Sequence, residues 1–132
     1  MPTPFRTSTG ITVELTGQHA LLRLPSEVDF ANYDDLHTCA QRLLDDGVPA
    51  MIFDLTSCEY CDSSVVDAIL RAHRRAGELN TPLTLRLPPS GIVRRVCAIT
   101  GVTRIVPFEE SEASVHQKSR IRLGSPESRF RR

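Results

Sequence analysis

Long apolar segments are absent from this chain of 132 residues. No stretch approaches the roughly 18 consecutive apolar residues that span a membrane. The first ten residues, MPTPFRTSTG, also lack the apolar centre of a secretory signal peptide. We therefore expect a cytoplasmic protein without membrane contact, and a length that suits one domain rather than two.

A net charge is absent too, since 16 basic and 16 acidic side chains cancel. The cancellation hides an asymmetry: residues 118–132 hold six basic residues and one acid, whereas residues 1–117 hold 10 basic and 15 acidic ones. An acidic body predicts no direct DNA binding, because affinity for DNA depends on cationic contacts with phosphates. The tail has little apolar surface and is expected to be disordered. It either only adds solubility or contacts an acidic partner or nucleic acid.

Motifs of common enzymes and metal sites are missing. The chain has no GxxxxGK phosphate loop, no GxSxG and no HExxH. It has one CxxC, no second such pair and no closely spaced pair of histidines, whereas a structural zinc site needs four ligands. We predict no catalytic activity, no cofactor and no metal site.

Strand patterns recur along the chain. Apolar residues alternate with polar ones or run together, which predicts strands at 11–16, 19–24, 50–55, 83–87 and 105–108. The first two are expected to form a hairpin. Residues 1–10, rich in Pro and Thr, are expected to be a flexible arm.

Helical spacing separates these strands. It predicts a first helix at 30–46, ended by Gly47, and a second at about 62–76, closed by Gly77. A third helix is expected from a Ser90 cap up to Gly101, and a fourth after Ser111. Strands that alternate with helices predict a single α/β domain over 11–117. We expect a mixed sheet of four to five strands, begun by the hairpin and flanked by about four helices.

One ordered set of segments resembles a known family. IFDLTSCEYCDSSVVDAILRAHRRAG holds an apolar strand ending in Asp-Leu and then Asp-Ser-Ser at a helix start. LTLRLPPSGIVRRVCAITGV follows with a strand, a Pro-Ser pair, a helix and Thr-Gly, and VPFEESEASV ends the set. Upstream stands Ser26-Glu27-Val28-Asp29. Together these segments resemble the STAS domain family, and more closely its bacterial anti-sigma-factor antagonists.

The resemblance implies a protein that binds an anti-sigma factor, often a serine kinase, and thereby frees a sigma factor. It implies that phosphorylation of Ser63, with Ser64 as the alternative, reverses binding, and that a phosphatase can restore it. It places the partner surface at Glu27, Asp29, Asp62, Ser63, Ser64 and Val65. Val65 and Asp67 stand where the family usually has glycine, and Ser26 replaces another. A monomer or weak dimer is expected.

The residues around Ser63 support this hypothesis physically. A hydroxyl at a helix start lies near unpaired backbone N–H groups, which can hold a phosphate of about −1.5 to −2 charges. The alternative is plain helix capping, by Asp62 or by Ser64 with Asp67 in a capping box. Glu27 and Asp29 can equally be loop acids or a cap for the helix that follows.

Cys58 and Cys61 offer a rival function. A CxxC between a strand and a helix is typical of thiol–disulfide oxidoreductases. Glu59 and Asp62 beside the thiols argue against this, because neighbouring carboxylates raise a thiol pKa. Cys39 and Cys97 lie on apolar helix faces and are expected to fill the core.

Overall fold

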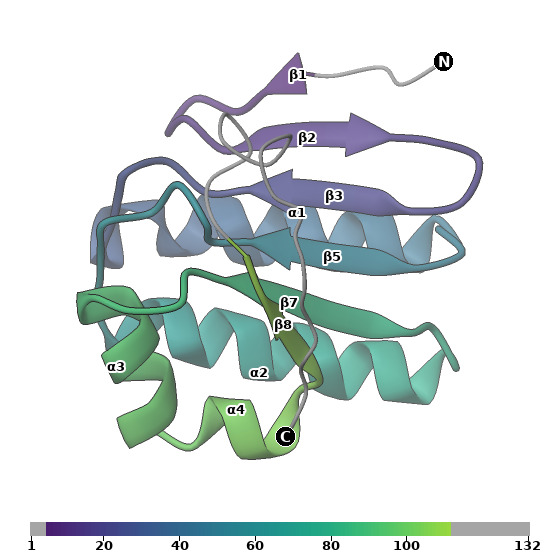
Figure 1. Ribbon diagram of the computed structural model, residues 1–132. Helices are drawn as coiled ribbons and strands as arrows, with labels where there is room; N and C mark the ends of the chain where they lie inside the picture. The colour runs from purple at the N-terminus through teal and green to yellow at the C-terminus, as the bar shows by residue number, and fades with distance from the viewer. Residues whose placement is uncertain (1–4, 112–132) are drawn as a thin grey trace.

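A six-stranded mixed sheet forms the centre of the molecule (Figure 1). The computed structural model describes residues 5–111. The spatial order is β1-β2-β3-β5-β7-β8: β1 (Phe5–Arg6), β2 (Thr12–Leu15), β3 (Ala20–Arg23), β5 (Met51–Asp54), β7 (Leu83–Leu87) and β8 (Phe108–Glu110). The first three strands pair antiparallel, and β3, β5, β7 and β8 pair parallel. The mixed α/β class and the starting hairpin are confirmed, with more strands than expected.

Alternation of apolar residues explains the inner strands. In β7, Leu83, Leu85 and Leu87 are buried, whereas Thr84 and Arg86 are only half-buried. In β5, Met51 and Phe53 point into the core and are at most 1% exposed. Each of these inner strands therefore contributes one or both faces to a core that also receives the apolar sides of the helices.

Two long helices, α1 (Tyr33–Asp45) and α2 (Ser63–Glu78), run along the sheet and contact each other (Figure 1). Shorter helices complete the fold: η1 (Phe30–Asn32), α3 (Ile92–Ile99) and α4 (Val102–Ile105). In α2 the buried residues follow the helical repeat and are Val65, Val66, Ala68, Ile69, Ala72 and Ala76. No helix within residues 5–111 is long and apolar enough to cross a membrane.

The described part of the segment expected to be a flexible arm contains a strand, so that prediction was wrong for residues 5–10. Phe5 pairs with Val13 in the sheet. The Thr7 N–H then donates to the Ile11 carbonyl at 2.9 Å, and the Thr9 hydroxyl donates to the Asp35 carboxylate at 2.5 Å. Threonine hydroxyls and backbone pairing, rather than apolar periodicity, hold this segment in place.

Helix ends follow the predictions only in part. Gly47 adopts a left-handed φ of 88° after α1, as expected. Gly77, expected to close α2, lies inside it, and the left-handed residue after this helix is Asn80, with φ 57°. Ser90 does not cap α3, because Gly91 is the N-cap residue and no side chain caps this helix.

The end of the described chain also differs from the prediction. A strand was expected at 105–108, but α4 extends to Ile105 and β8 begins at Phe108. Gly101, with a left-handed φ of 87°, follows the end of α3 as predicted, and the short helix α4, which was not predicted, begins directly after it. The helix expected after Ser111 and the basic tail lie outside the described residues.

Candidate functional site at the start of α2

A small second sheet joins the two segments that the sequence places in the partner surface. Strand β4 (Glu27–Val28) pairs parallel with β6 (Tyr60–Cys61), so that Glu27 lies opposite Tyr60. The Ser26 carbonyl accepts from the N–H of Glu59 at 2.6 Å and from that of Tyr60 at 3.0 Å. Glu27 and Asp29 therefore lie at the same edge of the molecule as the start of α2.

Asp62 caps α2, so the first of the two capping alternatives is correct. Its carboxylate accepts from the Ser64 N–H at 3.0 Å and from the Ser64 hydroxyl at 2.5 Å. Ser63 is the first helical residue and is exposed, whereas Ser64 is half-buried. Within residues 5–111 the Ser63 hydroxyl has no hydrogen-bonding partner. The two serines thus differ: the hydroxyl of Ser64 belongs to the cap, and that of Ser63 is available to a partner.

Val65 does not belong to the exposed surface, which corrects the prediction for this residue. Its side chain is 1% exposed and packs in the core. The reason is the helical repeat, because Val65 lies on the same face as Ile69 and Ala72. Its methyl groups therefore point away from any partner that approaches Ser63.

Asp67 does not form a capping box with Ser64. Its carboxylate accepts from the Tyr33 hydroxyl at 2.7 Å and from Arg71 Nε at 2.9 Å. The hydrogen bond from Tyr33, followed by that from Arg71, holds the pKa of Asp67 below its ordinary value. Asp67 thus ties α1 to α2 one turn after Ser63.

Asp29 has a structural role besides its exposure. Its carboxylate accepts from the Ala31 N–H at 2.9 Å, and its own N–H donates to the Asn32 side chain at 3.0 Å. This capping box starts η1, so the interpretation of Asp29 as a helix cap is confirmed. Glu27 is exposed, and its partner contact stays a prediction.

Two exposed aromatic residues were missed from the sequence. Phe30 is 77% exposed directly after Asp29, and Tyr60 is 46% exposed opposite Glu27. In β4 and β6 the outward residues are Glu27 and Tyr60, and the inward ones are Val28 and Cys61. Two-residue strands are too short to show an alternating pattern, so only the pairing reveals which side chains point out.

The side chain of Asp54 stabilises the C-terminal end of β5, next to this edge of the molecule. It is the last residue of β5 and is 2% exposed. It accepts from Arg23 Nε at 3.3 Å, and from the Thr56 N–H at 2.9 Å and hydroxyl at 2.6 Å. These bonds fix the turn that leads from the sheet towards β6 and the start of α2.

Comparison with known proteins identifies the family. The sequence matches the STAS domain family over residues 10–115. The chain belongs to the STAS domain family. Its fold is similar to that of SpoIIAA from Bacillus in the phosphorylated form, with a TM-score of 0.63 and 19% identity over 86% of this chain and 100% of that one. No curated protein matches the sequence significantly.

Two other solved structures share the fold of this STAS domain. A putative anti-sigma factor antagonist from Thermotoga maritima has a TM-score of 0.66 and 18% identity over 80% of this chain and 90% of that one. An anti-sigma factor antagonist from Mycobacterium paratuberculosis has a TM-score of 0.66 and 19% identity over 79% of this chain and 89% of that one. At these identities the likeness concerns the fold.

The thiols of this STAS domain are unsuited to redox catalysis. Cys58, Cys61 and Cys97 are buried and unpaired by disulfides. Burial is the main cause that raises the pKa of Cys58 to about 11 and the pKa values of Cys61 and Cys97 to about 12. A catalytic thiol needs access and a lowered pKa. The geometry therefore opposes the oxidoreductase alternative.

The other two cysteines, Cys39 and Cys97, pack against or in the core, as the sequence predicts. Cys97 is 0% exposed in the core, as predicted, and Cys39 is half-buried against it. Among residues 5–111 no group of three or more His, Cys, Asp or Glu side chains is placed to hold a metal ion.

The surface around Ser63 in this STAS domain is acidic and apolar. Residues 24–70 contain ten acidic residues and one basic residue, Arg42. The acids at this edge are Glu27, Asp29, Glu59 and Asp62, beside the exposed rings of Phe30 and Tyr60. A complementary partner presents basic and apolar side chains.

Proposed function

We propose that this STAS domain is an anti-sigma factor antagonist that is switched off by phosphorylation of Ser63. Unmodified, it binds an anti-sigma factor and so releases a sigma factor. The observation that carries the proposal is the exposed, unpartnered Ser63 hydroxyl at the start of α2, at the edge where β4 and β6 meet. Family membership supports it independently.

The proposed partner surface consists of Glu27, Asp29, Asp62, Ser63 and Ser64, to which we add the exposed rings of Phe30 and Tyr60. Exposed aromatic rings contribute strongly to protein–protein binding when a partner desolvates them. The carboxylates set the sign of the partner and speed its approach. We therefore propose an anti-sigma factor that presents an apolar groove lined by Lys or Arg, and that is itself the serine kinase.

Phosphorylation acts where the carboxylate of Asp62 already occupies the helix start. A phosphate on Ser63 adds about −1.5 to −2 charges beside this carboxylate. The two groups compete for the same backbone N–H donors and repel each other. A partner that packs closely on Ser63 must then desolvate a doubly charged group, which weakens binding. A phosphatase that removes the phosphate restores the binding surface.

The test combines binding and phosphate mapping with the cognate anti-sigma factor. Ser63→Ala is expected to bind as the unmodified protein does, because a methyl group keeps the surface neutral. Ser63→Asp is expected to weaken binding by about 1–3 kcal/mol, roughly 5- to 150-fold. Incubation with the kinase and ATP, followed by mass spectrometry, is expected to place the phosphate on Ser63.

Ser57→Asp is the matched control, because Ser57 is an exposed serine in the loop between β5 and β6. The same charge at this position is expected to change affinity less than twofold if the contact centres on Ser63. Equal binding of Ser63→Asp and Ser63→Ala contradicts the charge mechanism. A phosphate on Ser64 alone, or on neither serine, contradicts the assignment of the modified residue.

A further inference from the structure

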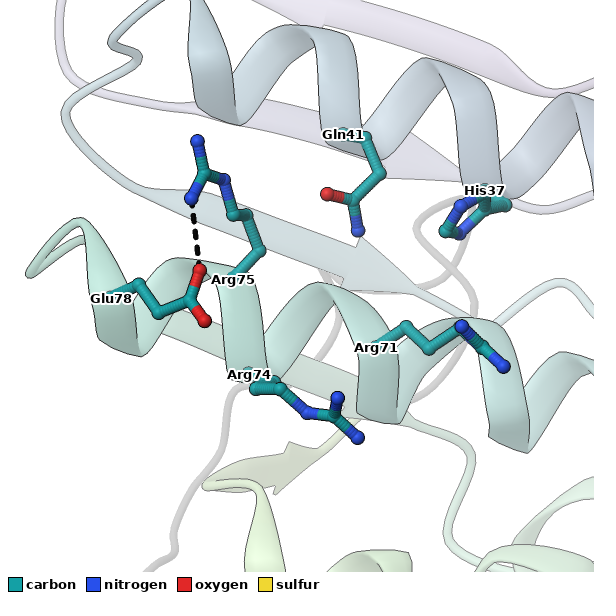
Figure 2. A pocket seen from close by; sticks show the side chains of 6 residues that line it. All are labelled: His37, Gln41, Arg71, Arg74, Arg75 and Glu78. Carbon is teal, nitrogen blue, oxygen red and sulfur yellow. Dashed lines mark hydrogen bonds and ion pairs between the residues drawn. The ribbon is translucent and has the colours of Figure 1, made fainter.

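A basic groove lies between α1 and the C-terminal half of α2, away from the start of α2. It has a volume of about 240 Å³. Figure 2 shows His37 and Gln41 pointing from α1 towards α2, and Arg75 reaching from α2 towards α1. The α2 residues of its lining stand at i, i+3, i+4 and i+7 on one helix face: Arg71, Arg74, Arg75 and Glu78.

Two polar groups of this groove lack partners. Arg74 is exposed and forms no ion pair within the described part of the chain. The Nδ1 atom of His37 is buried and has no hydrogen-bonding partner among residues 5–111. The His37 ring is held in place by stacking on Tyr33, with ring centroids 5.7 Å apart and planes 5° from parallel. A buried polar atom without a partner costs free energy, which a ligand recovers when a turn of the ring brings this atom to the groove.

The other two arginines are oriented by carboxylates. Arg71 Nε donates to Asp67 at 2.9 Å. Arg75 donates through Nε to Asp45 and through Nη1 to Glu78, both at 2.9 Å. These bonds hold both guanidinium groups and leave terminal nitrogens able to donate to a ligand. Arg75 is thus shared by two carboxylates and Arg71 is paired with one, so that Arg74 carries the positive charge that no carboxylate matches within residues 5–111.

We propose that the groove binds the phosphate group of a small anionic ligand. Guanidinium groups match phosphate oxygens in geometry and charge, and the Gln41 amide and His37 Nδ1–H add neutral donors. Three of the ten basic residues of an otherwise acidic body stand within residues 71–75. Ser63 and Arg74 are eleven residues apart, roughly 16 Å along the helix axis. The site is therefore separate from the partner surface, and its test does not depend on the proposed function.

The test titrates the full-length protein with inorganic phosphate, and with chloride and citrate at the same ionic strength, while NMR follows backbone amide and arginine Nε–Hε signals. Phosphate is expected to cause saturable shifts at His37 and at residues 71–78, with much smaller shifts for chloride. Citrate separates a phosphate site from a general site for anions. Citrate binding as tight as that of phosphate, or shifts that do not saturate, overturns the proposal.

Variants locate the site. Arg74→Gln and His37→Phe are each expected to weaken phosphate binding about tenfold, since each removes a donor to a charged ligand. Phenylalanine keeps the stacking on Tyr33, so loss of binding in this variant reports the ring nitrogen rather than the packing. Arg95→Gln is the control, because Arg95 is an exposed arginine on α3 outside the groove. Equal loss in Arg95→Gln overturns the assignment to this groove.

Discussion

The two ends of α2 differ in charge and in the elements that surround them. The first turn, capped by Asp62, meets β4 and β6 at an acidic and apolar edge, whereas residues 71–75 carry three arginines that line the groove beside α1. This order suits the helix dipole, which favours negative groups at the N-terminus and positive ones near the C-terminus. The comparison teaches that one helix can present two surfaces of opposite charge, each suited to a different binding partner.

The largest change in stability is expected from a substitution on the inner face of the first turn of α2, compared with one on its outer face. Val65→Asp places an unpaired carboxylate in the core and is expected to cost at least about 3 kcal/mol of the free energy of unfolding. Ser63→Asp, two residues earlier, is expected to change it by less than about 1 kcal/mol, because Ser63 is exposed. Urea unfolding of both variants measures the difference. Similar losses in both would contradict the assignment of Ser63 to the outer face.

A smaller loss of stability is expected when the N-cap of α2, at the acidic end of the helix, is removed. Asp62→Ala removes the acceptor of the Ser64 N–H and is expected to lower the free energy of unfolding by about 0.5–2 kcal/mol. Asp62→Asn keeps an oxygen acceptor and is expected to recover most of this loss. Denaturant midpoints of the two variants measure the cap directly. If Asp62→Asn is as unstable as Asp62→Ala, the carboxylate charge rather than the capping bond stabilises this end.

Asp67 lies between the two ends of α2, and its contribution to the free energy of unfolding depends on pH. Because the folded state lowers its pKa below the ordinary value of 3.8, its ionised form stabilises the fold above that value. This stabilisation is lost as the pH falls through the folded-state pKa. Asp67→Asn is expected to cost less than about 1 kcal/mol at pH 7, because the ion pair with Arg71 is exposed.

The measurement for Asp67 is the difference in free energy of unfolding between wild type and Asp67→Asn, followed from pH 7 towards pH 3 at low salt. The difference is expected to shrink with falling pH. Asp34→Asn is the control, since Asp34 is exposed in the first turn of α1, and it is expected to change stability by less than about 0.5 kcal/mol. A difference that grows as the pH falls would contradict the sign derived for Asp67.

The smallest effect concerns the thiols beneath the acidic end. Burial and pKa values raised to about 11 and 12 predict that Cys58 and Cys61 react with a thiol reagent at pH 8 only when the protein opens. Cys39→Ser removes the half-buried thiol and leaves only buried ones. Labelling followed by mass spectrometry measures the rates. Rapid labelling of Cys61 in the folded protein would contradict this prediction and support the oxidoreductase hypothesis.

Much of the fold could be predicted because its signals are local. The alternation in β7, the apolar run of β5 and the helical repeat of α2 each depend on neighbours within a few residues. The short strands β4 and β6 could not be predicted in this way, because each has two residues and its partner lies more than 30 residues away. The end of α2 was also misplaced, since Asn80 rather than Gly77 takes the left-handed conformation.

The sequence by itself determined that Ser63 stands at a helix start, in a chain that resembles STAS domains, because capping signals and the helical repeat act within one or a few turns. Only the tertiary structure decided that Val65 turns inward, that Glu27 lies opposite Tyr60, and that the arginines of α2 line one groove with His37 and Gln41 of α1. These placements depend on how distant segments pack, since pairing and burial are set by contacts between elements and not by the residues of any one of them.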